Sequence, residues 1–352
     1  MSAISLNSFT GRYFTSDIPD VMVSLSSSAV KVVMTLSDTD TGDVYYDETL
    51  WPVGGAVSLT DLGTLLEPFA RRRLVLGVSL TARQLSSTDA EVASSSSNCE
   101  ILYSLADVGM SASAFYNSHF LTILDGPKVT AAGRLEYLHY YGSEPASCVA
   151  TYTDGTTRSF TPSVVSGNGS YTTIDVSPSL FAVEGKAIAS YEVTAGSRSQ
   201  QFLVDCRVPD SAPILIFDNS FGVQELIYCI GTHKVDPSYE RKQVRIGTQL
   251  RNYRIRETRE FHASTGVLTT PMANWADELF RSQEIYVVNI INGQPSVGKE
   301  IVITDSKSEN SNDDDYLPSF SFTYQYSQRL HNVMQADRAG RIFDNTFDNT
   351  FN

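Results

Sequence analysis

The chain has 352 residues, a formal net charge of −14 and 41% hydrophobic residues. This length exceeds what one hydrophobic core usually supports, and the composition is ordinary for globular protein, so we expect two or three folded domains. Residues 1–125 hold 6 Lys/Arg against 14 Asp/Glu, residues 126–210 hold 6 against 8, and residues 211–352 hold 14 against 18. Since no block is basic overall, nucleic-acid binding is not expected as the main task.

The first block is predicted to consist mostly of strands. Short β-branched runs in residues 20–53 surround the polar turn 38–43, a hairpin signal. A helix is expected next, with Thr60 as its N-cap and with apolar residues at helical spacing, namely Leu62, Leu65, Leu66 and Phe69. The serine-rich segment 86–98 is predicted to be a loop between strands.

The second block, residues 126–210, begins at the Gly126-Pro127 boundary. Its segments alternate apolar and polar residues, with a hairpin turn at Asp154-Gly155 and further turns every 8–15 residues. This pattern predicts an immunoglobulin-like β-sandwich of about 85 residues. Cys148 and Cys206 could face each other across it, but no tryptophan lies between them, so a disulfide is the less favoured alternative.

The third block, residues 211–340, opens with an apolar run and continues as long alternating strands. The segment 269–282 is predicted to be an amphipathic helix, with Pro271 near its start and Trp275, Leu279 and Phe280 on one face. We therefore expect a mainly β protein of serial β-sandwich-like domains with two short helices. The last residues, 341–352, are expected to form an extended arm.

That arm carries Phe343, Phe347 and Phe351 at intervals of four. A helix would place the rings along one side, but Asp-Asn-Thr is a poor helix former. In a strand, odd-numbered positions share one face, so the three rings would lie together. The arm could fold back on its own domain, or it could add a strand to a neighbouring subunit or to another protein.

No catalytic motif appears in the sequence. Nucleophile elbows, zinc-binding HExxH helices, Walker loops and dinucleotide-binding GxGxxG turns are absent. The five histidines lie at positions 119, 139, 233, 262 and 331, without ligand spacing. In the turn 38–43, Asp38 and Asp40 fit a calcium loop, but Thr49 stands where a bidentate Glu is needed. The acidic run 312–315 is predicted to be a solvated loop. We expect no enzyme activity, metal or cofactor.

Residues 233–262 reverse the local sign of charge, with eight Lys/Arg against four Asp/Glu. Three interpretations stay open: a solvated strand face, pairing with an acidic face of a neighbouring copy, or, least favoured, phosphate binding. As candidate subunit-interface residues we take the three terminal phenylalanines, Phe343, Phe347 and Phe351, together with Arg241, Lys242, Arg245, Arg251, Arg254, Arg256 and Arg259.

Targeting signals are also missing. The first 14 residues lack a basic segment and an apolar segment, which predicts no signal peptide. No apolar run approaches the roughly 18 residues that a membrane span needs. We expect synthesis and assembly in a reducing cytoplasm.

The third block carries a resemblance to a known group. The stretches "FDNSFGVQELIYCIGTHKVDPSYERKQVRIGTQLRNYRI", "ANWADELFRSQEIYVVN" and "ITDSKSENSNDDDYLPSFSFTYQYSQR" resemble tail proteins of phages and prophages of Bacteroides-type bacteria. The middle stretch "YTDGTTRSF…YTTIDVSPSLF…YEVTAGSRSQQFLVD" is similar to the immunoglobulin-like module that accompanies them. Together these segments cover roughly 60% of the chain.

The resemblance implies a structural role in the virion, in the distal tail or baseplate, with assembly in the host cytoplasm. The expected partners are further copies of the chain in a ring and other tail proteins. The alternative is a carbohydrate- or surface-binding adhesin built of β-sandwiches. A tail-associated hydrolase would need a pair of carboxylates in a cleft.

If the terminal arm joins subunits, deleting residues 341–352 should leave a soluble, folded monomer that no longer enters particles. Each ring buries an area worth about 1.5–3 kcal/mol before the cost of ordering the tail. Circular dichroism and particle assembly would be measured together. Unfolding of the truncated protein, or normal assembly, would contradict the arm hypothesis.

Overall fold

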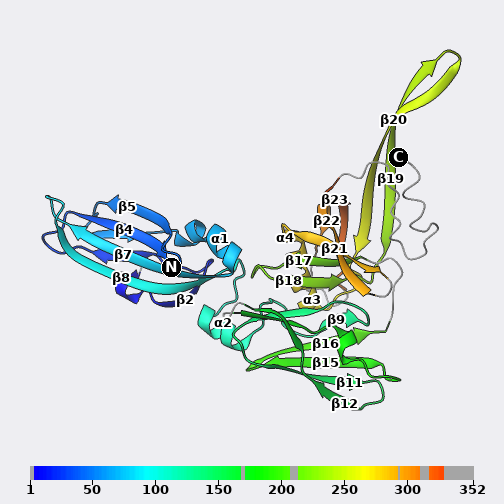
Figure 1. Ribbon diagram of the computed structural model, residues 1–352, viewed down its shortest axis with the longest axis horizontal. Coiled ribbons are helices and arrows are strands. Elements are labelled where there is room, and N and C mark those ends of the chain that lie inside the picture. Colours follow the sequence, from blue (N-terminus) through cyan, green and yellow to red (C-terminus); the bar gives the residue numbers. More distant parts are fainter. Residues whose placement is uncertain (1–3, 168–170, 207–212, 292–293, 310–316, 329–352) are drawn as a thin grey trace. The chain divides into compact units, whose positions relative to one another are not determined.

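The computed structural model describes residues 4–167, 171–206, 213–291, 294–309 and 317–328 (Figure 1). The terminal segment 341–352, with its three phenylalanines, and the acidic run 312–315 lie outside these residues. Contacts divide the chain into two compact units. The first contains residues 1–122 with the short segments 140–142 and 220–222, and the second contains the rest.

The first unit packs two β-sheets around one core. The sheets share a cluster of buried side chains, among them Val21 and Val57 from one sheet and Met34 and Leu80 from the other. The larger sheet runs β2 (Gly11–Phe14), β8 (Glu91–Leu102), β7 (Val75–Leu85), β4 (Lys31–Asp38) and β5 (Val44–Leu50). The smaller one runs β1 (Ile4–Ser5), β3 (Val21–Ser24) and β6 (Ala56–Leu59). Every second residue of β4 is buried, as strand geometry requires.

The predicted first helix is α1 (Leu62–Arg73), and it buries Leu62, Leu66 and Ala70. Its N-cap is Asp61 rather than the predicted Thr60. Asp61 takes a left-handed backbone conformation, and its carboxylate accepts a hydrogen bond from the Thr64 hydroxyl at 2.7 Å. The unit also contains η1 (Leu6–Ser8) and α2 (Ala112–Ser118), which the sequence analysis does not anticipate.

The prediction of a loop over residues 86–98 is wrong for most of the segment. Only the first residues turn, and from Glu91 onward the chain is β8, paired antiparallel with β7 along its length. Ser97 is buried and its hydroxyl donates to the Phe9 carbonyl at 2.6 Å. Pairing with a long neighbouring strand thus outweighs the weak strand preference of serine.

The predicted turn 38–43 joins β4 and β5, so the hairpin interpretation is confirmed. The buried Asp38 carboxylate accepts hydrogen bonds from the amides of Asp40 and Thr41, from the Tyr45 hydroxyl and from Arg73. Burial alone would raise the pKa of Asp38, but these donors lower it below its usual value. The carboxylate is therefore engaged by the turn and by α1.

The second unit begins with another pair of sheets. One runs β12 (Thr157–Phe160), β11 (Ala146–Tyr152), β15 (Ile188–Ala195), β16 (Arg198–Asp205) and β9 (Lys128–Ala131). The other runs β10 (Tyr137–Tyr141), β14 (Tyr171–Asp175) and β13 (Ser163–Gly167), and η2 (Pro178–Phe181) lies nearby in sequence. Tyr191 stacks on Phe202 with ring centroids 4.7 Å apart, and its hydroxyl donates to the Val176 carbonyl. Cys148 is buried and Cys206 exposed, both as free thiols.

A seven-stranded sheet completes this unit, in the order β18 (Gln224–Tyr228), β17 (Ile214–Asp218), β21 (Ile285–Ile291), β22 (Gln294–Lys307), β23 (Ser321–Tyr326), β20 (Gln249–Ser264) and β19 (His233–Ile246). The predicted helix 269–282 forms two pieces, α3 (Thr270–Ala276) and α4 (Glu278–Arg281). Trp275 and Leu279 are fully buried, as their shared face predicts. The mainly β fold class with few helices is confirmed.

A buried polar network joins the two parts of the second unit. The Lys128 ammonium of β9 pairs with Glu136 at 2.8 Å and lies 4.8 Å from the centre of the Trp275 ring. The Trp275 indole in turn donates to Glu225 at 2.9 Å, as does the Asn219 amide at 3.0 Å. The buried polar side chains of Lys128 on β9 and Glu225 on β18 thus have their partners only when the sheet that contains β9 and the seven-stranded sheet are in contact.

His139 belongs to the same junction. Its Nε2 lies 2.8 Å from the Gln224 carbonyl, which can only accept, so Nε2 carries the proton. Its Nδ1 lies 2.9 Å from the Thr173 hydroxyl, which donates to it. Burial lowers the pKa of His139 to about 4.

This buried histidine predicts an acid-sensitive junction. The unfolded chain binds a proton near pH 6.5 and the folded one near pH 4, so acid favours unfolding between these values. Protonation of His139 does not lower the free energy of unfolding above pH 6.5, and it lowers this free energy by about 3 kcal/mol at pH 4. The free energy of unfolding, measured with denaturant between pH 4 and pH 6.5, should depend less on pH in His139→Gln than in the wild type. The exposed control His119→Gln should match the wild type. Equal slopes in all three proteins would contradict the assignment.

Candidate interaction surface

The end of the seven-stranded sheet continues as a free hairpin. β20 pairs with β23 only from Phe261 to Ser264. Over residues 236–260, β19 and β20 pair only with each other in the described part of the chain. From here on, 'the arm' means this hairpin and not the C-terminal segment 341–352. Figure 1 shows the hairpin projecting beyond the other strands of its sheet. Every residue from Asp236 to Arg256 is exposed.

Local sequence explains the shape of the arm. Gly247, with a φ of 62°, and Thr248 form the turn between paired residues Ile246 and Gln249. A register shift follows next to Tyr253, and the pairing then continues to the base of the hairpin. There Phe261 is buried and stacks on Tyr324 with ring centroids 4.8 Å apart. The base is therefore anchored in the core, while no described segment of the chain packs on the outer strands.

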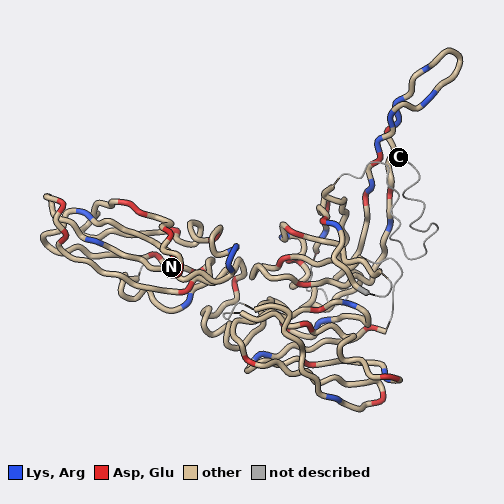
Figure 2. Tube along the Cα trace, in the orientation of Figure 1, with Lys and Arg blue, Asp and Glu red and all other residues tan. Residues whose placement is uncertain are grey.

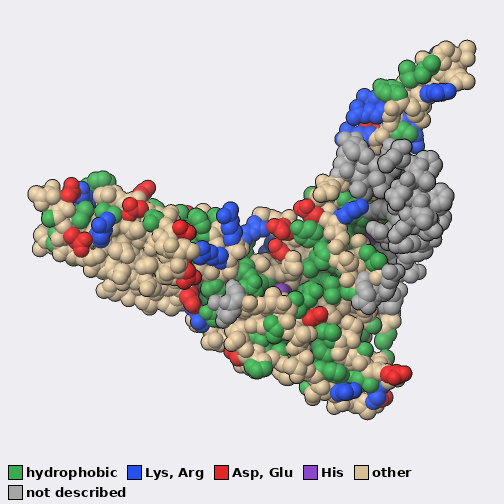
Figure 3. All heavy atoms as spheres, in the orientation of Figure 1, with side chains coloured by type: hydrophobic (Ala, Val, Ile, Leu, Met, Phe, Trp, Pro, Cys, Tyr) green, Lys and Arg blue, Asp and Glu red, His purple; other side chains and the backbone are tan. Residues whose placement is uncertain are grey.

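The arm gathers all the predicted basic interface residues: Arg241, Lys242, Arg245, Arg251, Arg254, Arg256 and Arg259. Figure 2 shows the basic residues along the hairpin, and Figure 3 shows them on its surface beside apolar side chains. The predicted Phe343, Phe347 and Phe351 lie outside the described residues, so the structure does not place them relative to the arm.

The strand register sorts these charges onto two faces, because directly paired residues point to the same side of a ribbon. Glu240 is opposite Arg256, Lys242 opposite Arg254, and Val244 opposite Arg251. This side, which we call the basic face, therefore presents four basic residues and one acidic residue between positions 240 and 256, while nearer the base it also carries the paired Asp236 and Glu260. The other side mixes Arg241 and Arg245 with apolar residues.

Most basic residues of the arm have no acidic partner within it. Among the described residues, none of the six basic residues within 239–256 forms an ion pair, whereas Arg259 near the base pairs with Glu257. Lys242 and Arg254 are like charges placed directly opposite each other, which destabilises a strand pair. A two-stranded hairpin without a covering layer is already marginal in water. The charge pattern therefore favours contact with an anionic partner.

The tip also exposes large apolar side chains, which are not among the predicted interface residues. Ile246 is 62% exposed, Leu250 60% and Tyr253 64%. The strand register places Ile246 and Leu250 on opposite sides of the ribbon, and Tyr253 lies at the register shift. These residues lack the period-2 alternation that predicts a buried strand face, so the sequence pattern gives no signal for them. Exposed aromatic and aliphatic groups beside arginines are a common composition of protein interfaces.

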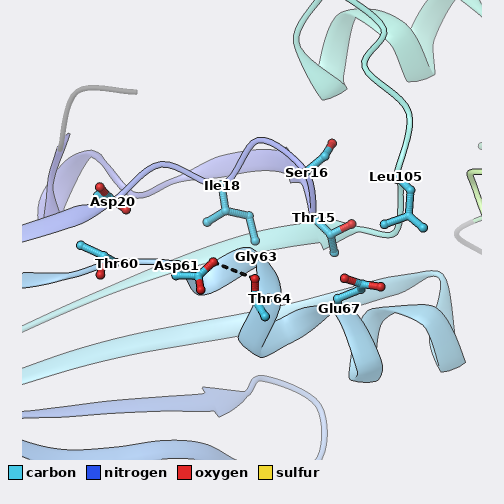
Figure 4. Close-up of a pocket in the computed structure, with 10 residues that line it drawn as sticks. All are labelled: Thr15, Ser16, Ile18, Asp20, Thr60, Asp61, Gly63, Thr64, Glu67 and Leu105. Carbon is cyan, nitrogen blue, oxygen red and sulfur yellow. Dashed lines mark hydrogen bonds between the residues drawn. The ribbon is translucent and has the colours of Figure 1, made fainter.

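An open cavity of about 570 Å³ lies in the first unit and is the other candidate site (Figure 4). Three carboxylates line it, from Asp20, Asp61 and Glu67, together with hydroxyl groups. A glycosidase needs one carboxyl group whose pKa is raised by burial. Here Asp61 is exposed and the other two are only half-buried. Gly63 is required for packing, because a Cβ there would lie 2.4 Å from the Thr15 carbonyl oxygen.

The remaining candidates have structural partners. His233 contacts the Tyr324 hydroxyl and His262 contacts Thr323, both between strands of the seven-stranded sheet. Within the described ranges, no group of three His, Cys, Asp or Glu side chains is placed to hold a metal ion. No helix in that same part of the chain is long and apolar enough to cross a membrane.

Comparison with known proteins adds little. No protein-family model matches the sequence, and no curated protein matches it. A mutated three-immunoglobulin-domain fragment of titin is 9% identical, with 91% of this chain and 86% of that chain covered, at a TM-score of 0.19. An I-band fragment of titin is also 9% identical, covering 92% and 87%, at a TM-score of 0.18. Scores this low carry no argument about function.

Shortening the arm should leave the rest of the protein folded. Replacing residues 240–256 by Asn-Gly would close the hairpin between Tyr239 and Glu257, which are already paired. Since the removed residues are all exposed, the melting temperature should stay within about 3 °C of the wild type. Differential scanning calorimetry measures this. A fall of about 10 °C or more would show that the arm is packed on the body.

Proposed function

We propose that this chain is a structural, non-enzymatic subunit of a phage tail, in the distal tail or baseplate, and that it forms a ring. The observation that carries the proposal is the arm, a ribbon of basic and apolar residues whose side chains are exposed. Exposed strands of this kind join proteins by pairing with a sheet edge or by lying across a sheet.

The structure of the second unit supports this role for the arm. The base of the hairpin belongs to a seven-stranded sheet with a buried core, and the network around Lys128 ties that sheet to the immunoglobulin-like sheets. The base of the arm is therefore fixed to a large body. A hairpin that is fixed at its base loses less conformational entropy on binding than a free tail does. The resemblance of this block to phage tail proteins points the same way.

Electron microscopy and native mass spectrometry of the purified chain test the proposal. At about 10 µM, where contacts of micromolar affinity are populated, we expect closed rings of one stoichiometry. The protein with the shortened arm is the matched control and should be monomeric. Monomers of the wild-type chain would contradict the ring. Glycan binding by both proteins, without assembly, would favour the adhesin alternative.

A further inference from the structure

The arm differs in charge from the rest of the chain. Its outer part, residues 239–256, carries six of the 26 basic residues and one of the 40 acidic residues, and the whole arm, residues 236–260, carries seven basic and four acidic side chains. The residues outside 239–256 carry 20 basic and 39 acidic side chains. A second copy of the chain therefore presents an acidic surface to the arm, and the question is which part of that surface fits it.

One sheet edge in the first unit has the complementary charge. No lysine or arginine occurs between Lys31 and Arg71, a stretch with seven acidic residues. Four of these are exposed on or beside β5 and form no ion pair with any described residue: Asp40, Asp43, Asp47 and Glu48. We call this strand with its flanking residues 40–51 the acidic edge.

The acidic edge is open to another strand. β5 is the last strand of its sheet, and within the described residues its only strand neighbour is β4. Edge strands leave backbone N–H and C=O groups unpaired and accept further strands unless charge or a covering segment prevents it. Exposed apolar side chains stand at both ends of this edge, with Val44 58% and Trp51 68% exposed.

The two surfaces also match in length and composition. β5 has seven residues and the arm strand 239–246 has eight, so they extend about 23 and 26 Å at about 3.3 Å per residue. On β5, the adjacent Asp47 and Glu48 point to opposite faces of the strand. The arm likewise carries basic residues on both sides, with Lys242 and Arg254 on one and Arg241 on the other. Both surfaces place exposed apolar groups beside their charges.

We propose that the arm of one copy docks on the acidic edge of a second copy, with its basic side chains paired to the carboxylates. This inference rests on the proposed function and names the partner surface of the arm. Because arm and edge are different surfaces of one chain, the contact is head-to-tail. Such contacts generate a ring when the rotation closes.

Two sets of charge reversals test the contact. The arm set is Lys242→Glu, Arg254→Glu and Arg256→Glu, and the edge set is Asp43→Lys, Asp47→Lys and Glu48→Lys. Each set alone should weaken self-association at least about tenfold, as measured by sedimentation velocity in about 0.1 M salt. The control set Asp107→Lys, Glu184→Lys and Glu192→Lys changes the net charge as the edge set does, but at other exposed positions, and should associate like the wild type. Circular dichroism checks that every variant is folded.

Mixing the two variants gives the decisive result. In the mixture, the acidic arm of the arm variant can dock on the basic edge of the edge variant. The native basic arm of the edge variant can dock on the native acidic edge of the arm variant. An equimolar mixture should therefore recover association that neither variant shows alone. The recovered complex should weaken in about 1 M salt, where the screening length falls to about 3 Å.

The other outcomes separate the inference from the proposed function. If the arm set abolishes association and the edge set does not, the arm docks elsewhere, and the inference fails while the ring stands. If the wild-type chain stays monomeric, both fail. If the wild type but not the arm variant retards duplex DNA in a gel, the arm binds phosphates, and docking on the acidic edge is overturned.

Discussion

The buried ion pair between Lys128 and Glu136 is the constraint on which the second unit depends. Burial raises the pKa of Glu136, and the Lys128 charge at 2.8 Å offsets part of that effect. Removing one partner of such a pair typically costs about 3–5 kcal/mol, because the other charge remains buried without compensation. The Lys128 ammonium also lies over Trp275, at the centre of the neighbouring core. The Lys128 charge therefore couples the sheet that contains β9 to the core around Trp275.

This coupling matters for the arm, which has little stability of its own. Its outer strands are exposed on both faces and place like charges opposite each other. Only the base, where Phe261 stacks on Tyr324, belongs to a core. A stable base with an exposed outer part suits a segment whose remaining interactions come from a partner, since the direction of the strands is set before binding.

Much of the fold follows from local pattern, and the exceptions have a common physical cause. The alternation of buried and partly buried residues in β4 arises because a single strand packs on a core, and the helical spacing around Trp275 arises in the same way for a helix. Each pattern therefore predicts its own element correctly. The serines of β8 become a strand only because β7 pairs with them. Lys128 and Glu136 appear as surface residues until two sheets enclose them. The charge of the basic residues in the arm is visible in the sequence, so they can be predicted as candidate interface residues. Their exposure on both faces follows from the pairing of β20 with β23, which covers only Phe261–Ser264, and the sequence does not show where that pairing ends.

The charge pattern also bears on which contacts a ring of this kind would avoid. An exposed ribbon and an open sheet edge can each pair with their own kind, which is the usual route to aggregation. Two arms would bring their basic faces together, and two acidic edges would oppose Asp47 and Glu48 with the same residues. Like-charge contacts of this kind disfavour both self-pairings, whereas arm against edge brings opposite charges together. In the head-to-tail arrangement, the same side chains thus supply attraction for the correct contact and repulsion against the two incorrect ones.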